Sequence, residues 1–323
     1  MNVLISSAGR RGALVRIIKE SIANVGGKVF AVDAGRWSSA CRLADGWGQV
    51  PRCTDNSFCK HLRSYAHDHD VKLIIPTIDT ELAILSQHRE FFSDAGVHVA
   101  VSGPATIKIA ADKIATHEFL KSLGLPVIEH FDVASTAEDL PYPLIIKPRF
   151  GSASAGVHIL EDAEACTFYR KRVELPVLQS LAPGKEYTVN FFADGKGGCL
   201  AEVPHLRVET RGGEVSKCVT VKEPRLMQIA QELCKHLPDA WGPLCYQAFI
   251  DDIGTVRIIE LNARFGGGYP IAHYAGADFV SPLLRIGSGL PLQEGPLHWQ
   301  GGIVMTRWDD AVFTTAQEVG LCA

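Results

Sequence analysis

Residues 256–268 read VRIIELNARFGGG, an apolar stretch that becomes polar at its end and runs into three glycines. Glu260 and Asn262 are two positions apart in this predicted strand, so both side chains leave the same face. Gln247 lies in the preceding predicted strand, and a turn of two or four residues would place it on that face too. Oxygen ligands of this kind suit Mg²⁺, and the guanidinium of Arg264 suits a phosphate or carboxylate. Taken alone, the segment is equally compatible with a solvated polar strand end.

A second informative segment is PLIIKPRFGSASAGV, residues 143–157. An apolar strand ends at Lys147 and runs into a loop of small residues that includes Ser152, Ser154 and Gly156. Small residues let backbone N–H groups approach phosphate oxygens, and the lysine adds a point charge. The Walker pattern is absent, because no G-K-[ST] leads into a helix. A flexible hairpin loop is an equally good interpretation of this segment alone.

The first hundred residues alternate between strand-like and helix-like stretches. This βαβ rhythm predicts a parallel sheet covered by helices. The apolar runs are residues 3–6, 28–32, 73–76 and 97–101, with helical stretches at 13–23 and 81–92. Gly103-Pro104 is a predicted seam, followed by two short helices split around Lys113. From Pro143 onward the pattern becomes rich in strands, so the fold class is α/β followed by α+β.

Bulk composition excludes several classes of protein. The chain has 323 residues and a formal net charge of -4, which gives no basic footprint for nucleic acid. Nine cysteines are scattered without metal-finger spacing, and no apolar run approaches the ~20 residues of a membrane span. No leader-like segment opens the sequence. We therefore expect a cytoplasmic enzyme without a membrane or nucleic-acid partner.

The N-terminal turn SAGRRG, residues 7–12, is a partial dinucleotide fingerprint. It follows a predicted strand and opens a helix, and Asp33 ends the next strand. Ser7 replaces the first glycine, which weakens the match. The turn predicts an anion site, in which Gly9, Arg10 and Arg11 are candidates to hold a substrate anion. It also supports a rival hypothesis, an NAD(P)-dependent oxidoreductase, which leaves the other two segments unexplained.

Taken in order, these segments resemble the ATP-grasp superfamily, and most closely its carbamoyl-phosphate-synthetase-like and pyrrolysine-pathway ligase branch. The motifs that carry the resemblance are Asp112-Lys113, residues 142–148, residues 151–156, Gly184-Lys185-Glu186-Tyr187, Gln247 and residues 260–268. The resemblance implies an ATP-grasp fold with a Rossmann-like N-terminal domain at residues 1–104. It further implies a small lobe with a phosphate flap at 105–182. The large lobe, with the magnesium site and a C-terminal extension, would span 183–323.

The resemblance also implies roles for individual residues. Residues that would contact ATP are Lys113, Lys147, the flap residues Ser152, Ser154 and Gly156, the hinge residues Gln179, Ser180 and Leu181, and Glu186 at the ribose. Gln247, Glu260 and Asn262 would hold Mg²⁺, with Mn²⁺ as an alternative. The neutral Gln247 leaves open whether one or two metal ions bind. Arg264 and Lys147 would be the catalytic residues, with Arg264 stabilising an acyl phosphate.

The implied activity is that of a carboxylate–amine ligase that forms ADP and phosphate. A small carboxylic acid would be activated by ATP and joined to an amine, and a homodimer is compatible with the family. Candidate substrate contacts are Asp79, Glu81, Arg207, Arg211 and Gly267. Asp79 and Glu81 are equally good candidates for a helix cap, and the two arginines for a solvated hairpin. His205 and His273 are expected to be structural. A non-catalytic ATP-binding partner protein is the second rival hypothesis.

Overall fold

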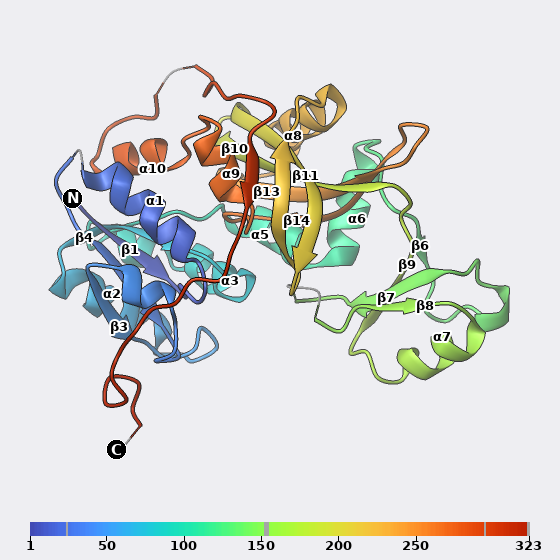
Figure 1. The fold of residues 1–323 in the computed structure, drawn as a ribbon, viewed down its shortest axis with the longest axis horizontal. Helices are drawn as coiled ribbons and strands as arrows, with labels where there is room; N and C mark the ends of the chain where they lie inside the picture. The colour runs from blue at the N-terminus through green and yellow to red at the C-terminus, as the bar shows by residue number, and fades with distance from the viewer. Residues whose placement is uncertain (24, 152–154, 294, 322–323) are drawn as a thin grey trace.

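The computed structural model describes residues 1–323 except 24, 152–154, 294 and 322–323. The N-terminal domain is a five-stranded parallel sheet in the order β3-β2-β1-β4-β5 (Figure 1). Its strands are β1 Asn2–Ser6, β2 Val29–Asp33, β3 Gly46–Gln49, β4 Val71–Pro76 and β5 His98–Val99. The interior positions of the central strands are mostly apolar because helices cover both faces of a parallel sheet. The predicted βαβ domain is therefore confirmed.

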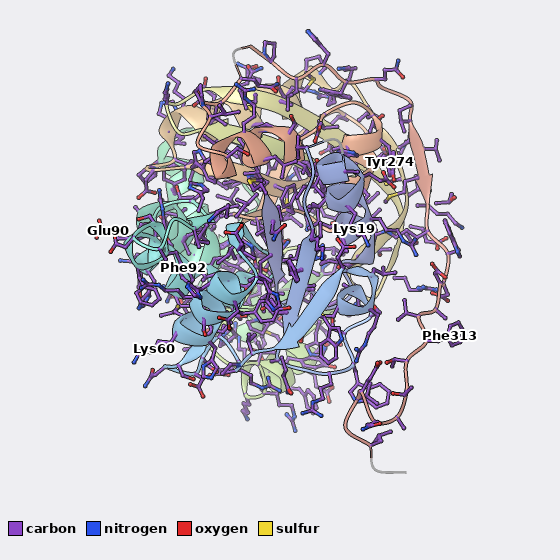
Figure 2. The ribbon with its side chains drawn as sticks, turned by 90° about the vertical axis from the view of Figure 1, so that its left-hand side faces the viewer. Lys19, Lys60, Glu90, Phe92, Tyr274 and Phe313 are labelled. Atoms are coloured by element: carbon purple, nitrogen blue, oxygen red, sulfur yellow. The ribbon has the colours of Figure 1, made fainter. Side chains whose placement is uncertain are left out.

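The helices of this domain are α1 Gly12–Ala23, α2 Phe58–Asp68, α3 Asp79–Gln87, α4 Arg89–Ser93 and the 3₁₀ turn η1 Ala40–Leu43. Helix α1 buries Leu14, Ile18 and Ile22, a spacing of four that keeps one face on the sheet. The helix predicted at 81–92 is two helices, because the helical conformation is interrupted at His88. Figure 2 shows Lys60 and Glu90 on the outside of these helices, while Phe92 is fully buried.

The large lobe is built on a six-stranded antiparallel sheet in the order β14-β13-β10-β11-β12-β15. Its strands are β10 Lys185–Asp194, β11 Cys199–Arg211, β12 Glu214–Thr220, β13 Trp241–Ile250, β14 Val256–Asn262 and β15 Val304–Thr306. Its helices are α8 Pro224–His236, α9 Tyr269–Tyr274 and α10 Val280–Gly287. The last strand comes from the C-terminal segment and pairs with β12 at the edge of the sheet.

The small lobe is a four-stranded sheet in the order β6-β9-β7-β8. It contains β6 His130–Phe131, β7 Leu144–Pro148, β8 His158–Leu160, β9 Pro176–Ser180, the turn η2 Ala137–Asp139 and helix α7 Ala163–Arg170. This lobe has its own apolar core, which includes Leu144, Leu160 and Leu178. Helices α5 Pro104–Ala111 and α6 Lys113–Ser122 pack against β14 of the large lobe. The domain boundary predicted at residue 105 stays a prediction.

The C-terminal segment after β15 has no regular structure as far as residue 321. It runs from the large lobe down over the N-terminal domain (Figure 1). Arg16 of α1 pairs with Asp310 at 2.6 Å, and Arg42 lies 3.7 Å from Glu318. Phe313, by contrast, is almost fully exposed. Among the described residues, no helix is long and apolar enough to cross a membrane.

Candidate functional site

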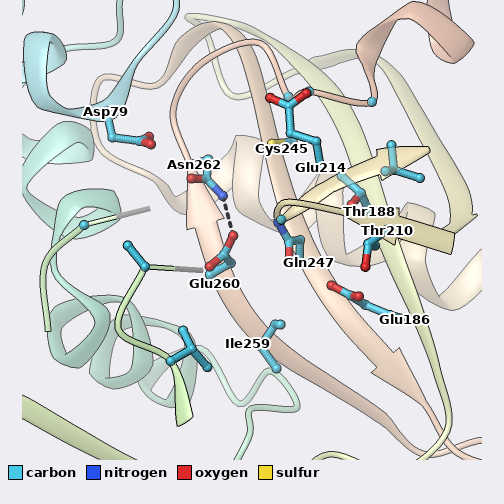
Figure 3. Close-up of a pocket in the computed structure, with 18 of the residues that line it drawn as sticks. Asp79, Glu186, Thr188, Thr210, Glu214, Cys245, Gln247, Ile259, Glu260 and Asn262 are labelled. Carbon is cyan, nitrogen blue, oxygen red and sulfur yellow. Dashed lines mark hydrogen bonds between the residues drawn. The ribbon is translucent and has the colours of Figure 1, made fainter. Parts of the chain in front are cut away.

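A cavity of about 640 Å³ lies where the three parts of the chain meet. The N-terminal domain contributes the turns after β1 and β4, the small lobe contributes β7 and the segment after β9, and the large lobe contributes one face of its sheet. Figure 3 shows the acidic and amide side chains of this cavity over the strands of the large lobe. Most of the predicted site residues line it, namely Asp79, Lys113, Lys147, Gln179, Ser180, Leu181, Glu186, Arg207, Gln247, Glu260, Asn262, Arg264 and Gly267.

The floor of the cavity is a set of cross-strand rows on one face of the large sheet. Because side chains alternate along a strand, residues two apart share this face. The rows are Asn262–Cys245–Asn190, Glu260–Gln247–Thr188 and Phe249–Glu186–Arg207. Antiparallel pairing therefore gathers Glu260, Asn262 and Gln247 on the side of β14. It places the acid–base pair of Glu186 and Arg207 on the side of β11.

A β-bulge places Gln247 opposite Glu260. The turn between β13 and β14 spans residues 251–255, so the condition of a two- or four-residue turn, under which the sequence would place Gln247 on this face, is not met. An odd turn alone would put Gln247 opposite Ile259 and on the other face from Glu260. The register shifts between Gln247 and Ala248, which restores the pairing of Gln247 with Glu260. The polar row therefore depends on one extra residue in β14.

Glu260, Asn262 and Gln247 fit a divalent cation that keeps several positions for phosphate and water. The Asn262 amide donates to Glu260 Oε1 at 3.0 Å (Figure 3). A cation between them requires the amide turned by 180° about χ2, so that its oxygen joins the carboxylate. Among the described residues, no group of three or more His, Cys, Asp or Glu side chains could hold a metal. The donor set therefore suits Mg²⁺ shared with a ligand better than a protein-only metal cage.

Two lysines face this row from the other side of the cavity. Lys113 begins α6 and donates to the Gly151 carbonyl at 3.0 Å, which ties it to the start of the predicted flap. Asp112 caps the same helix and binds Arg149 at 2.6 Å. Burial lowers the pKa of Lys147 to about 8, with Lys113 adding to the effect and Glu260 opposing it. A phosphate anion would supply the anionic partner that these two ammonium groups lack among the described residues.

Strand β9 and the residues that follow it line the cavity from the small lobe. Gln179 is buried, and its side-chain amide contacts His130. Burial lowers the pKa of His130 to about 3, so the ring is neutral and accepts from the amide. Glu186 lies 3.2 Å from Arg207 Nε. Burial raises the pKa of Glu186, and Arg207 opposes the rise.

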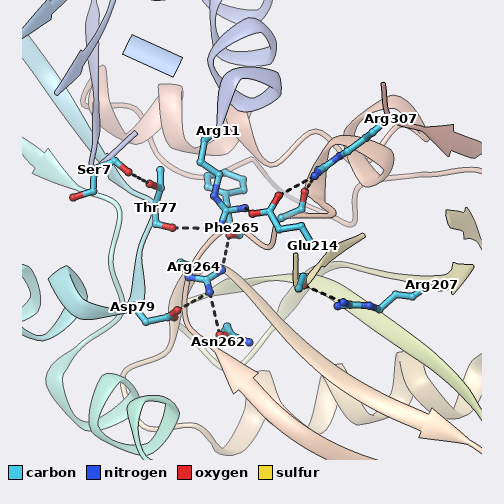
Figure 4. A network of polar contacts seen from close by, with 12 residues as sticks. Ser7, Arg11, Thr77, Asp79, Arg207, Glu214, Asn262, Arg264, Phe265 and Arg307 are labelled. Atoms are coloured by element: carbon cyan, nitrogen blue, oxygen red, sulfur yellow. Dashed lines mark hydrogen bonds and ion pairs between the residues drawn. The ribbon is translucent and has the colours of Figure 1, made fainter. Parts of the chain in front are cut away.

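The opposite end of the cavity is rich in arginine (Figure 4). Arg264 donates to Asp79 at 2.6 Å and to Asn262 at 3.2 Å. Burial lowers the pKa of Arg264, but Asp79, Cys245 and Glu260 together outweigh burial, so the pKa is raised. Arg307 donates to Glu214 at 2.9 Å and also binds the Gly267 carbonyl. Residues of the N-terminal domain, of the glycine-rich loop (residues 266–268) with the preceding Arg264, and of the C-terminal segment thus meet at this end of the cavity.

Comparison with known protein families identifies two domains. Residues 3–100 match the model of a PylC-like N-terminal domain, and residues 110–268 match that of an ATP-grasp domain. The chain is an ATP-grasp protein. This confirms the predicted superfamily, branch and fold. The matched segments contain all three cross-strand rows and both lysines, whereas Arg307 lies outside them.

Two relatives of this ATP-grasp protein show how far its sequence likeness extends. The N-terminal section of the carbamoyl phosphate synthase large chain from Methanopyrus kandleri is 24% identical over 256 residues, which is 68% of this chain and 44% of the relative. The D-alanine–D-alanine ligase of Thermotoga petrophila is 30% identical over 123 residues, which is 36% of this chain and 40% of the relative. The ATP-grasp protein thus spans less than half the length of these relatives.

Solved structures of similar fold cover almost all of the ATP-grasp protein. The biotin carboxylase domain of Hydrogenobacter thermophilus 2-oxoglutarate carboxylase, in complex with MgADP and bicarbonate, has a TM-score of 0.71 and 16% identity over 93% of this chain and 72% of its own. The N5-carboxyaminoimidazole synthetase of Staphylococcus aureus, complexed with ADP, has a TM-score of 0.70 and 17% identity over 92% of this chain and 79% of its own. At these identities the likeness shows the fold alone.

The structure corrects one predicted substrate contact, Glu81. This side chain is fully buried and does not line the cavity. Its carboxylate accepts from the hydroxyls of Ser6 and Ser7 at 2.6 and 2.8 Å, and from the backbone N–H of Thr77 at 2.8 Å. Glu81 therefore caps α3 and joins the turns after β1 and β4, while Asp79 alone of the pair faces the cavity.

The structure also moves Arg211 away from the site. Arg211 is exposed at the tip of the β11–β12 hairpin and pairs with Asp309. It does not line the cavity, whereas its neighbour Thr210 does, because successive side chains along a strand point to opposite faces. Gly156 packs beside Pro148 and is likewise outside the lining. The predicted flap residues Ser152 and Ser154 lie outside the described residues.

Glu214 and Arg307 are site residues that the sequence did not indicate. Glu214 lines the cavity at the start of β12, directly after the Gly212-Gly213 turn. Arg307 follows β15 in a segment that no sequence motif describes. The predicted hairpin was the one signal available for Glu214. Its second strand runs back beside the strand that carries Arg207, so the first residues of that second strand lie near the same cavity.

The oxidoreductase hypothesis is not supported by the N-terminal turn. Asp33 would have to bind a ribose hydroxyl in a dinucleotide site. Instead, its Oδ2 accepts from Gly9 N–H at 2.8 Å and its Oδ1 from Gly35 N–H at 2.9 Å. The carboxylate therefore fixes the turn of the ATP-grasp protein internally. The family comparisons agree with this, because the matching domains are PylC-like and ATP-grasp.

Proposed function

We propose that this protein is an ADP-forming carboxylate–amine ligase. The observation that carries the proposal is the position of Glu260, Gln247 and Asn262 in one cavity with two lysines, of which Lys147 is buried, and with a mostly buried Arg264 beyond them. Such an arrangement suits phosphoryl transfer, which needs mainly alignment and charge neutralisation. The likeness to D-alanine–D-alanine ligase and to carbamoyl phosphate synthase supports it.

The nucleotide would bind with its base at Gln179, Ser180 and Leu181, and with its ribose at Glu186. Lys113 and Lys147 would neutralise the phosphates, and the flap would exclude water from the reacting groups. Glu260 and Asn262, with Gln247, would hold Mg²⁺, which supplies positive charge at the transferring phosphoryl group. The single carboxylate in this row favours a metal site that depends on the nucleotide for much of its affinity.

Chemistry would proceed in two displacements. A carboxylate oxygen of the acid forms a bond to the γ-phosphorus of ATP while the bond from that phosphorus to the bridging oxygen breaks, so ADP leaves. Arg264, paired with Asp79, would stabilise charge on the acyl phosphate. The amine nitrogen then bonds to the carbonyl carbon, phosphate leaves with the bonding pair, and the nitrogen loses a proton to give the amide.

Several finer points belong to the same proposal. Mn²⁺ is an alternative metal, because it accepts the same oxygen ligands. The eight cysteines among the described residues are free, which supports a reducing, cytoplasmic location. A homodimer is compatible with the likeness to a biotin carboxylase domain that was solved as a dimer. Light scattering in solution would test the dimer.

The test is a screen for ADP and phosphate release with MgATP. Amino acids, hydroxy acids and other small acids are offered singly and with amines, and a coupled assay follows ADP. We expect release that depends on both MgATP and a particular acid, and that falls at least 100-fold in Glu260→Gln. A folded parent protein that binds MgADP and releases no ADP across the whole panel would overturn the ligase proposal.

That negative result would favour the alternative, a non-catalytic ATP-binding partner. One observation supports the alternative, namely the neutral Gln247 in the metal row where a second carboxylate would strengthen the site. The two candidates differ in the effect of Gln247→Glu. In an active ligase the added carboxylate changes the metal dependence of turnover, whereas in a binding protein it changes only the affinity for MgADP.

A further inference from the structure

Arg11 is a mostly buried cation at the arginine-rich end of the cavity, and among the described residues it has no close carboxylate partner. Its side chain is 17% exposed, and it lines the cavity at the start of α1. Its Nη1 lies 3.6 Å from Glu214, and its Nη2 lies 3.4 Å from the Thr77 carbonyl. Both distances exceed those of a good charge-assisted hydrogen bond, which is about 2.7–2.9 Å.

The two neighbouring arginines have closer partners than Arg11. Arg264 contacts Asp79 at 2.6 Å, and Arg307 contacts Glu214 at 2.9 Å (Figure 4). Glu214 thus lies between two guanidinium groups and is closer to Arg307. Three guanidinium groups therefore share two carboxylates in this part of the cavity, and Arg11 is the one held most loosely.

A buried charge without a good partner is costly, so the geometry implies an anion that comes from outside the chain. Burial lowers the pKa of Arg11, and nearby Arg264 lowers it further. The space beside Arg11 is kept open by glycine, since a Cβ at residue 267 would lie 3.1 Å from Arg11 Nη1. An anion at Arg11 would thus lie near Arg264 and against the glycine-rich loop.

We propose that Arg11 binds an anionic group of the acid substrate, so that the N-terminal domain forms part of the acid-binding site. The proposal rests on the ligase function proposed above. The chemistry that fits is a carboxylate, bound by the planar fork of the guanidinium. This carboxylate is either the one that reacts with ATP or a second one on the same acid, and the experiment below separates these two sources.

The test compares the parent with Arg11→Gln and Arg11→Lys in the ADP-release assay. Acids are offered as matched pairs in which one carboxylate is replaced by an amide, such as L-glutamate with L-glutamine and L-aspartate with L-asparagine, beside the general panel. We expect Arg11→Gln to raise the KM for the acid on the order of 10- to 100-fold while the KM for ATP changes less than about twofold. Arg11→Lys, which keeps the charge, should recover part of the loss.

The pattern across each pair identifies the bound group. A loss for the diacid with no loss for its amide means that Arg11 binds a second carboxylate, and an equal loss for both means that it binds the reacting one. Arg16→Gln is the matched control, since Arg16 lies in helix α1, which begins directly after Arg11, but pairs with Asp310 at the surface. Circular dichroism and MgADP binding establish that each variant is folded.

Two results would overturn the proposal, and they are distinct. If acids drive ADP release in the parent and Arg11→Gln gives the same KM for all of them, Arg11 does not bind the acid and the ligase function stands. If no acid drives ADP release in the parent, the ligase proposal itself fails, and the assignment of Arg11 fails with it.

Discussion

The two ends of the cavity solve the problem of buried charge differently. At the nucleotide end, Lys147 has no ion-pair partner within 4 Å among the described residues, and its pKa falls to about 8. At the arginine-rich end, Arg264 and Arg307 each have a carboxylate within 3 Å. Under the proposed function the first end would take its counter-charge from a ligand, whereas two of the three arginines at the second end are paired with carboxylates of the chain itself. Variants at the two ends should therefore separate nucleotide binding from acid binding.

The largest effect is expected from Glu260→Gln, at the nucleotide end. Loss of the only carboxylate in the metal row should lower kcat about 1,000-fold and weaken MgADP binding about tenfold. Steady-state ADP release and calorimetry measure the two changes. Glu209→Gln is the control, because Glu209 is exposed and pairs only with Lys217 and Ser216. Unchanged MgADP affinity in Glu260→Gln would place the metal elsewhere.

Glu81→Ala should produce the next largest effect, on the framework between the two ends. The change leaves the hydroxyls of Ser6 and Ser7 and the Thr77 N–H without their buried acceptor. We expect the free energy of unfolding to fall by about 3 kcal/mol, measured by urea denaturation. Glu90→Ala, at an exposed position of α4, should change it by less than about 0.5 kcal/mol. A loss as small as that of the control would mean that Glu81 does not hold the two turns together.

Arg307→Gln should act at the arginine-rich end alone. It removes the ion pair to Glu214 and the contact to the Gly267 carbonyl, so both groups lose their fixed positions. We expect the KM for the acid to rise about tenfold with MgADP affinity unchanged. Arg211→Gln, which breaks only the exposed pair to Asp309, is the control. A change in MgADP affinity instead would show that the two ends are not independent.

The smallest effect is the pH dependence of nucleotide binding. Because Lys147 has a pKa of about 8 in the free protein, it is mostly protonated at pH 7 and increasingly neutral above pH 8. Phosphate binding favours the protonated form, so MgADP binding should take up a proton and weaken about fourfold between pH 7 and pH 8.5. Calorimetry in buffers of different ionisation enthalpy measures the uptake. Lys147→Arg should abolish it; equal uptake in this variant would assign the proton to another group.

Much of the nucleotide end could be predicted from the sequence because its determinants are local. Glu260 and Asn262 share a face through strand periodicity alone, and Lys147 ends an apolar strand. The position of Gln247 required a bulge that periodicity does not reveal. The arginine-rich end depends on contacts between residues far apart in sequence, such as Glu214 with Arg307, and no local pattern encodes these.

Glu81 is a second residue whose role depends on contacts that the local sequence does not reveal. Acidic residues at the start of a helix serve either as caps or as ligands, and the sequence is identical in the two cases. What decides is the approach of β1 to β4, which brings Ser6 and Ser7 onto the carboxylate. Arg211 was misjudged because Thr210, and not Arg211, lines the cavity, and the register shifts in β11 before it cannot be read from the turn residues.

The distribution of apolar cores bears on how such a protein can diversify. Two buried clusters run without interruption from the N-terminal domain into the large lobe, joining residues such as Leu4 with Val189 and Ile5 with Phe279. The small lobe keeps a cluster to itself. Exchange of the small lobe for that of a relative would therefore disturb none of these shared clusters. Exchange of the N-terminal domain would require both shared clusters to be repacked. Recombination should thus replace the small lobe, which is proposed to contact the nucleotide, more readily than the unit that is proposed to carry the acid site.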